Sequence, residues 1–324
     1  WQHIIFFALP LLLGNIFQQL YNTVDNWVVG NWVGKQALAA TGSSAPIIFS
    51  LIGFFAGLAT GAGVIISQYY GAKNDKKVSE TVQTTIVMIL FLSIVISLAG
   101  VLLTPLMLKA MNTPENVLKE GETYLRIYFA GASGLLLYNA GSGILRAVGD
   151  SRRPLYFLIF TAILNTVLDL VFVIVFKWGI AGAAYATIIS QGLSAILVLI
   201  TLTRTKASYR ILWKKLSFSP FIFRQILAVG LPAAIQQLLT AVSNVFVQAY
   251  INNFGEDVMA GWSAYRNIDM FMLLPMMSVS LAGTTFTGQN TGAGNLKRVK
   301  EGVRTTLALA EMITVALLIF LFIF

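Results

Sequence analysis

Two aspartates lie within long apolar segments of this 324-residue chain, and both have amide side chains at helical spacing. Asp169 follows Asn165 by four residues, which places both on one face of a helix. Asp25 ends a polar stripe that also contains Asn15, Gln18 and Asn22. A carboxyl group among apolar residues either keeps its proton or binds a cation. We therefore interpret the two acids as an H⁺ or Na⁺ exchange site, in preference to aspartates that only pin helices through hydrogen bonds.

The composition places this chemistry in a membrane. Apolar residues make up 57% of the chain and charged residues only 11%, where a soluble domain carries about 25% charged residues. This excludes a soluble enzyme, a disordered chain and a nucleic-acid binder. The chain has no Cys and one His, His3, which excludes thiol chemistry, histidine triads and Cys or His metal clusters. We expect no enzyme activity and no cofactor other than a coupling ion, H⁺ or Na⁺.

Nine segments are long and apolar enough to cross a bilayer as helices, which need roughly 20 residues each. The sequence thus predicts an all-α polytopic membrane protein. The predicted spans are 4–32, 44–70, 79–108, 121–145, 155–177, 180–203, 222–252, 262–291 and 303–324. No phosphate-binding loop ending in Gly-Lys-Ser/Thr occurs, so we expect an ion gradient to supply the energy for any transport.

The basic residues predict the orientation of these spans. Sixteen of the 22 Lys and Arg follow spans two, four, six and eight, and six lie on the other side. Because cytoplasmic loops are rich in Lys and Arg, we expect these loops and the N-terminus in the cytoplasm. This predicts a multi-pass protein of a plasma (inner) membrane. The net charge of +9 then reflects topology and indicates no nucleic-acid partner.

An internal repeat divides the chain. Residues 68–80 and 289–301 are identical at seven of 13 positions at an offset of 221. Six spans separate the copies, so both enter the membrane in the same orientation as parallel repeats. We predict an N-lobe of six helices at 1–204, a cytoplasmic connection at 205–220 and a partial C-lobe at 221–324. Since the first lobe has six helices, we expect the last three helices of the second to follow Phe324.

The repeat also predicts a shared polar lining with a charge on only one side. The seventh span carries a stripe without acids, and Asp25 aligns there with Val247. We expect these stripes to line a substrate cavity, through Gln18, Asn22, Gln237, Thr240, Asn244 and Gln248. Gly53, Gly57 and Gly61 recur every four residues on the second span, which predicts close helix packing.

Several motifs, in this order and spacing, resemble the multidrug and toxic compound extrusion (MATE) family. They cover essentially the whole chain: residues 9–10 (Leu-Pro), 22–25 (Asn-Thr-Val-Asp), 68–72 (Gln-Tyr-Tyr-Gly-Ala), 145–154 (Leu-Arg-Ala-Val-Gly-Asp-Ser-Arg-Arg-Pro), 165–169 (Asn-Thr-Val-Leu-Asp), 179–187 (Gly-Ile-Ala-Gly-Ala-Ala-Tyr-Ala-Thr) and 289–293 (Gln-Asn-Thr-Gly-Ala). The resemblance implies twelve helices in two six-helix lobes that alternate access to a central cavity. For the branch with an ion site in the N-lobe, it implies coupling through Asp25, Asn165, Asp169 and Thr187.

The function that the resemblance implies is export of organic cations or amphipathic drugs in exchange for H⁺ or Na⁺. We expect a bacterial monomer whose partners are these small molecules and the lipid bilayer, with Na⁺ as a candidate ion at the four coupling residues. One alternative is a flippase for lipid-linked oligosaccharides from the same superfamily. It would need cationic residues for pyrophosphate, and the middles of the spans have none. A non-transporting membrane scaffold is the second alternative.

Overall fold

The structure is a computed structural model that describes residues 1–111, 113–251, 254 and 256–323. Within these ranges it contains ten α-helices and no strand. They are α1 (Gln2–Val28), α2 (Lys35–Gly71), α3 (Asp75–Ala110), α4 (Glu115–Ala130), α5 (Ala132–Ala147), α6 (Arg152–Asp169), α7 (Ile180–Arg204), α8 (Pro220–Ile251), α9 (Glu256–Gly292) and α10 (Leu296–Ile323). Eight candidate spans in the described part are long and apolar enough to cross a membrane. The predicted all-α membrane fold is confirmed.

The distribution of side chains is that of a protein dissolved in lipid. On α3, Leu102 is 76% exposed and Phe91 66% exposed, whereas Thr84 and Thr104 are fully buried. Apolar side chains that face lipid carry no free-energy penalty, so they need not fill the interior. Polar side chains can lie inside the bundle instead, where they form hydrogen bonds. Thr104, for example, donates to the Gly100 carbonyl oxygen at 2.6 Å.

The prediction of one continuous span at 121–145 is wrong. The structure has two 16-residue helices there, α4 and α5, which meet at Gly131. A Cβ atom on Gly131 would collide with the Ile188 side chain of α7. Glycine permits this close approach and also weakens the helix at this point, so the chain bends. The helices that contain the spans predicted to begin at 44 and 262 begin earlier, at Lys35 and Glu256.

The predicted repeat is confirmed in the backbone. Helices α2 and α9 have 37 residues each and begin and end at positions 221 apart. The turns that follow them share their hydrogen bonds: Asn74 N donates to Tyr69 O at 3.0 Å, and Asn295 N to Asn290 O at 2.9 Å. Asn74 Oδ1 and Asn295 Oδ1 then cap the next helices alike, each at 3.1 Å. The two copies therefore share the same helix length, turn and helix cap.

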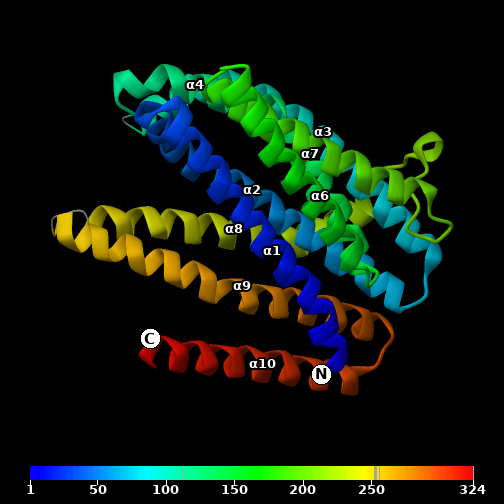
Figure 1. The fold of residues 1–324 in the computed structure, drawn as a ribbon. Helices are drawn as coiled ribbons and strands as arrows, with labels where there is room; N and C mark the ends of the chain where they lie inside the picture. The colour runs from blue at the N-terminus through cyan, green and yellow to red at the C-terminus, as the bar shows by residue number, and fades with distance from the viewer. Residues whose placement is uncertain (112, 252–253, 255, 324) are drawn as a thin grey trace.

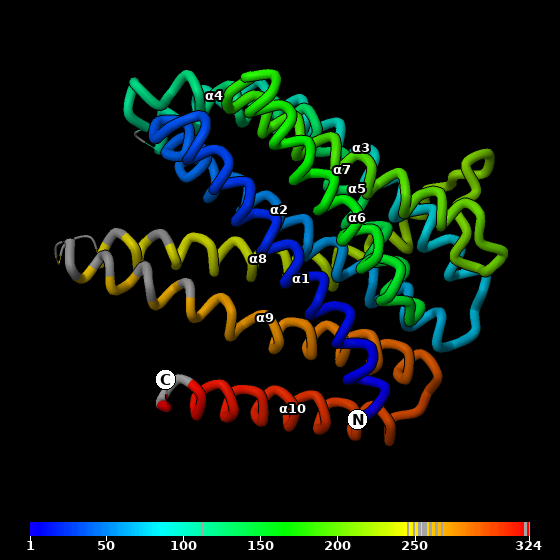
Figure 2. The backbone as a smooth tube through the Cα atoms, viewed as in Figure 1, coloured from blue at the N-terminus to red at the C-terminus, as the bar shows by residue number. Residues whose placement is uncertain are grey.

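We call the end of the bundle that carries residues 72–74, 148–151, 205–219 and 293–295 the basic end. There α8 and α9 lie against α2, and toward the opposite end they diverge from α4 and α7 (Figure 1). Gly57 packs on the Ala234 backbone and Gly61 on that of Gly230, so the predicted close packing of this glycine stripe is confirmed. The tube view shows α10 beside α9 and away from α2 (Figure 2). The division into lobes at 205–220 remains a prediction.

A reciprocal contact joins the two repeats at the basic end. A Cβ on Gly71 would collide with the backbone of Gln289, and one on Gly292 with that of Gln68. These positions are related by the offset of 221, so each repeat offers the same glycine to the same glutamine of the other. Gln289 Nε2 also donates to the Ala147 carbonyl oxygen at 2.8 Å. The two halves are thus tightly closed at this end.

Candidate functional site

The structure brings the two predicted acids together. Asp25 lies in the last turn of α1 and Asp169 is the last residue of α6. The two helices pack against each other, and the carboxyl groups of the acids face one another. Asn165 lies one turn before Asp169, and both are buried, at 1% and 0% exposure. Five oxygens and one amide nitrogen thus meet inside the first seven helices.

Thr187 completes the predicted set from a third helix. It is buried on α7, which packs against α6. Its Oγ1 donates to the Ala183 carbonyl oxygen at 3.0 Å, so its lone pairs can accept a hydrogen bond or coordinate a cation. Three of the four residues predicted to couple ions are therefore buried, and the fourth, Asp25, is half-buried and faces Asp169.

Each acid is followed by a π-helical turn. The helix widens into η1 (Val29–Val33) after α1 and into η2 (Leu170–Val175) after α6, and the two π-helical turns pack against each other. Such turns are rare and occur frequently at functional sites. Nothing in the residue types at these positions distinguishes them from ordinary helix, so the sequence did not predict them.

Three tyrosines surround the acids and were also missed. The Tyr21 hydroxyl lies beside Thr187, and Tyr124 and Tyr128 of α4 are 6% and 4% exposed. The rings of Tyr124 and Tyr128 stack with centroids 6.2 Å apart, and both hydroxyl groups lie near enough to Asp25 to interact with its charge. Their spacing of four residues on a helix is the one sequence signal that could have identified them. They supply hydroxyl groups beside the carboxyl pair.

The site has polar atoms without partners in the described part of the chain. They include both carboxyl oxygens of Asp169, Oδ1 of Asp25, and both Oδ1 and Nδ2 of Asn165. No salt bridge of the described residues involves either acid. Buried polar groups in proteins are normally hydrogen-bonded, and two facing carboxylates without a counter-ion are costly. A proton or a small cation with oxygen ligands fits these residues.

The stripe on α8 lies elsewhere. Gln237 is exposed beside the contact between α2 and α8, where Gly53 approaches its Cβ. Asn244 lines a separate cavity of about 530 Å³ with Arg266 and Asp269 of α9. Arg266 Nη1 donates to Gln248 Oε1 at 3.5 Å. The predicted lining residues Gln18 and Thr240 are exposed, and Asn22 is half-buried. The structure does not bring the α8 stripe to the acid pair.

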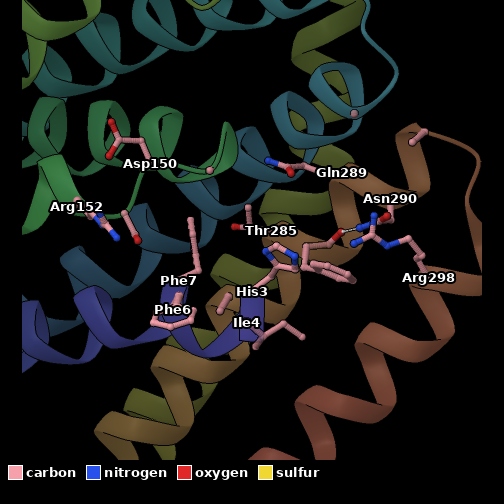
Figure 3. Close-up of a pocket in the computed structure, with 16 residues that line it drawn as sticks. His3, Ile4, Phe6, Phe7, Asp150, Arg152, Thr285, Gln289, Asn290 and Arg298 are labelled. Carbon is pink, nitrogen blue, oxygen red and sulfur yellow. Dashed lines mark hydrogen bonds between the residues drawn. The ribbon is translucent and has the colours of Figure 1, made fainter. Parts of the chain in front are cut away.

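A larger cavity of about 770 Å³ opens at the basic end (Figure 3). The start of α1, the turn between α5 and α6, and the end of α9 line it, with His3, Arg152 and Arg298 among its polar residues. Two of its charged groups have partners: Arg298 lies 5.4 Å from the ring centroid of Phe286, and Asp150 Oδ2 pairs with Arg153 Nε at 3.3 Å. None of the predicted site residues lines this cavity.

Comparison with known families assigns the chain. The MatE family profile matches residues 10–171 and 232–324. The chain belongs to the MATE family. This MATE chain is 35% identical over 303 residues to the "Probable multidrug resistance protein YpnP" of Bacillus subtilis (strain 168), covering 92% of the chain and 66% of YpnP. It is 31% identical to "Probable multidrug resistance protein YoeA" of the same organism, covering 100% of the chain and 72% of YoeA.

The MATE fold is confirmed by solved structures. The chain matches the "Outward-facing conformation of a multidrug resistance MATE family transporter of the MOP superfamily" with a TM-score of 0.93 and 27% identity. That match covers 99% of this chain and 72% of the other. The chain spans about two thirds of the length of YpnP. It is a membrane transporter of the MATE family and not an enzyme.

Proposed function

We propose that the full-length protein is a secondary active antiporter that exports cationic or amphipathic drugs in exchange for H⁺ or Na⁺. The observation that carries this is the pair of facing carboxyl groups on α1 and α6, of which Asp169 is fully buried and Asp25 half-buried. Neither has a cationic partner in the described residues. Such a pair is stable only when it holds a positive charge.

Asp25 and Asp169 bind the coupling ion in this proposal, and Asn165 and Thr187 complete its oxygen ligands. For H⁺, one carboxyl group holds the proton and the other accepts its hydrogen bond. For Na⁺, both carboxylates, Asn165 Oδ1 and Thr187 Oγ1 coordinate the ion. Hard oxygen donors of this kind suit either cation.

Ion binding moves α1 in the proposed cycle. Without a cation the two carboxylates repel each other and hold α1 away from α6. Binding removes that repulsion and favours a state in which α1 bends or shifts toward α6 and narrows the N-lobe pocket, which expels the drug outward. A ligand drives such a change only to the extent that it binds one state more tightly. The cation binds more tightly where the two carboxylates lie closer together, and this supplies the difference in affinity.

The substrates of the proposal are organic cations or amphipathic drugs. Relatives named as multidrug resistance proteins support this class. The polar residues Gln18, Asn22, Gln237, Thr240, Asn244 and Gln248 are the candidates for lining the route. We place the protein in the inner membrane of a bacterium as a monomer of two six-helix lobes, with its N-terminus and basic end in the cytoplasm.

Drug flux through the full-length protein in vesicles tests the proposal, with an H⁺ gradient and a Na⁺ gradient imposed in separate experiments. We expect one gradient, and not the other, to drive ethidium accumulation. Ethidium movement that neither gradient accelerates would overturn the antiport. Translocation of lipid-linked oligosaccharide without ethidium transport would favour the flippase, and neither activity would favour the scaffold.

A further inference from the structure

The buried face of α6 is polar. From Thr161 onward, its buried residues in the described structure are Thr161, Asn165 and Asp169, four residues apart. Apolar residues of the same helix face outward instead: Phe160 is 54% exposed and Ile163 61% exposed. A helix in lipid turns polar groups inward only when something inside binds them.

Helix α7 presents a matching face. Ser190 and Ser194 are each 4% exposed, and they follow Thr187 at three and seven residues. Ser194 Oγ donates to Thr161 Oγ1 at 2.7 Å and joins the two helices. Because α6 begins at the basic end, Thr161 lies nearer that end than Asp169 by about 12 Å of helix at 1.5 Å per residue.

Polar side chains of α5 extend this series of polar groups from α6 and α7 to the basic end. Gly134 packs on Gly192 and Gly141 on Val198 of α7, which places Tyr138 at the level of Ser194. The Tyr138 hydroxyl donates to the Pro154 carbonyl oxygen at 3.2 Å, in the first turn of α6. One Tyr side chain therefore bridges the stretch of α6 between Thr161 and the basic end.

Ser142 lies beside Tyr138 on the next turn of α5. Arg146 follows one turn later, so a positive charge stands at the end of the series. It opposes an unrestricted leak of cations. We call Asn165, Thr161, Ser190, Ser194, Tyr138 and Ser142 the polar seam.

The polar seam has buried atoms without hydrogen-bond partners along its length. Among the described residues these include Asn165 Oδ1 and Nδ2 beside the acids, Ser190 Oγ in the middle and Ser142 Oγ near the basic end. All three residues are at most 4% exposed. Buried water typically satisfies such groups, with two to four hydrogen bonds each. The unpartnered atoms lie on both sides of the bonded pair Thr161–Ser194.

We propose that the polar seam is a hydrated path through which the coupling cation passes between the acid pair and the basic end. This rests on the proposed antiport, which must exchange its ion with the side opposite to drug release. Hydroxyl and amide oxygens with ordered water suit a monovalent cation. No residue of the polar seam lines the described cavities of about 310 to 770 Å³, so we place the drug on another route.

The absence of cysteine from residues 1–324 makes the path directly testable. Ser190→Cys and Ser194→Cys are near-isosteric, and the full-length protein would carry one of them as its only cysteine. We expect Ag⁺ added to the side of the basic end to protect both thiols from later maleimide labelling in denaturant. The matched control is Ser93→Cys on α3, which is 2% exposed and neighbours the apolar Ile89, Leu92 and Ile96.

Ag⁺ access to the seam thiols with none to Ser93→Cys would support the path. Seam thiols as unreactive as Ser93→Cys would overturn it, whatever the result of the drug-flux experiment. The labelling does not depend on drug export, so the two proposals fail separately.

Flux gives a second test. Thr161→Val keeps the shape of the side chain and removes the bond to Ser194. We expect ion-driven ethidium flux to fall at least tenfold, equivalent to about 1.4 kcal/mol in the barrier, while ethidium affinity stays unchanged. Thr166→Val is the control on the same helix, since Thr166 bonds only its own helix at Ala162. Equal flux in Thr161→Val and Thr166→Val would overturn the proposal.

Discussion

Helices α1 and α8 occupy matching places in the repeat and differ in what they carry. On α1 the polar stripe ends in Asp25, which faces Asp169 and the buried side of α6. On α8 the matching residue is Val247, 42% exposed, and Gln237, Thr240 and Asn244 are exposed as well. Helices α2 and α9 share their length, and the turns that follow them share their hydrogen bonds. A duplicated backbone has thus retained its geometry while the charge resides in one copy.

The largest expected effect comes from removing that charge. Asp169→Asn keeps the size of the side chain and removes the carboxylate, so nothing holds the coupling ion at the fully buried position. We expect ion-driven ethidium flux in vesicles to fall to the level of protein-free vesicles, and Asp25→Asn to behave in the same way. Glu115→Gln, the same change at an exposed residue of α4, should retain wild-type flux. Substantial gradient-driven flux in Asp169→Asn would remove the acid pair from the mechanism.

Moving the acid to the other repeat should not restore transport. The double variant Asp25→Asn with Val247→Asp puts the carboxylate at the matching place on α8, away from Asn165, Asp169 and Thr187. We expect flux to remain at background, because an ion there meets none of the other three ligands. The measurement is ethidium flux beside the single variant. Recovery of flux would mean that α1 and α8 are functionally equivalent and that the ion site is not confined to the first repeat.

The contact that the repeats share should be sensitive in both copies. Gly71→Ala and Gly292→Ala each place a methyl group against the backbone of Gln289 or Gln68. We expect each to destabilise the state closed at the basic end by about 1–3 kcal/mol, the cost typical of overpacking. Thermal unfolding of the purified full-length protein measures this. Gly42→Ala on α2 is the control, since its Cβ would have nothing within 4 Å. If the two variants lost unequal amounts of stability, the two halves of the contact would contribute unequally to it.

The smallest effect is expected on α8. Asn244→Ala and Gln237→Ala remove exposed polar groups that do not touch the acid pair. Surface substitutions usually change the free energy by less than about 0.5 kcal/mol. We therefore expect about a twofold change in ethidium affinity. Fluorescence titration of the detergent-solubilised protein measures it. A loss of binding would identify α8 as a main substrate surface and sharpen the contrast with α1.

The sequence was informative where local chemistry decides the outcome. Polar turns at 72–75 and 293–295 predicted helix ends, and the register of Gln, Asn, Lys and Glu there predicted the repeat. Spacing placed Asn165 and Asp169 on one face, as the structure has them. That the same face continues to Thr161 follows from the same periodicity. These features depend on neighbours in the chain.

Features that depend on packing were not predicted. The break at Gly131 arises where Ile188 of another helix approaches. The positions of Tyr124 and Tyr128 beside Asp25 depend on how α4 packs against its neighbours. Their sequence is compatible with any buried aromatic pair. The distance of the α8 stripe from the acids likewise follows from the divergence of the helices toward one end (Figure 1).

The π-helical turns after Asp25 and Asp169 have a consequence for deletions. A π-helical turn holds one residue more than an α-helical turn requires. Removing one residue from Val29–Val33 or Leu170–Val175 would leave a continuous α-helix there. The wide turn absorbs its extra residue, so the deletion would change the direction of the acid relative to the residues beyond the turn only slightly. Among relatives, single-residue gaps at these two positions should therefore mark helices without the wide turn, and the facing carboxyl pair should be retained there.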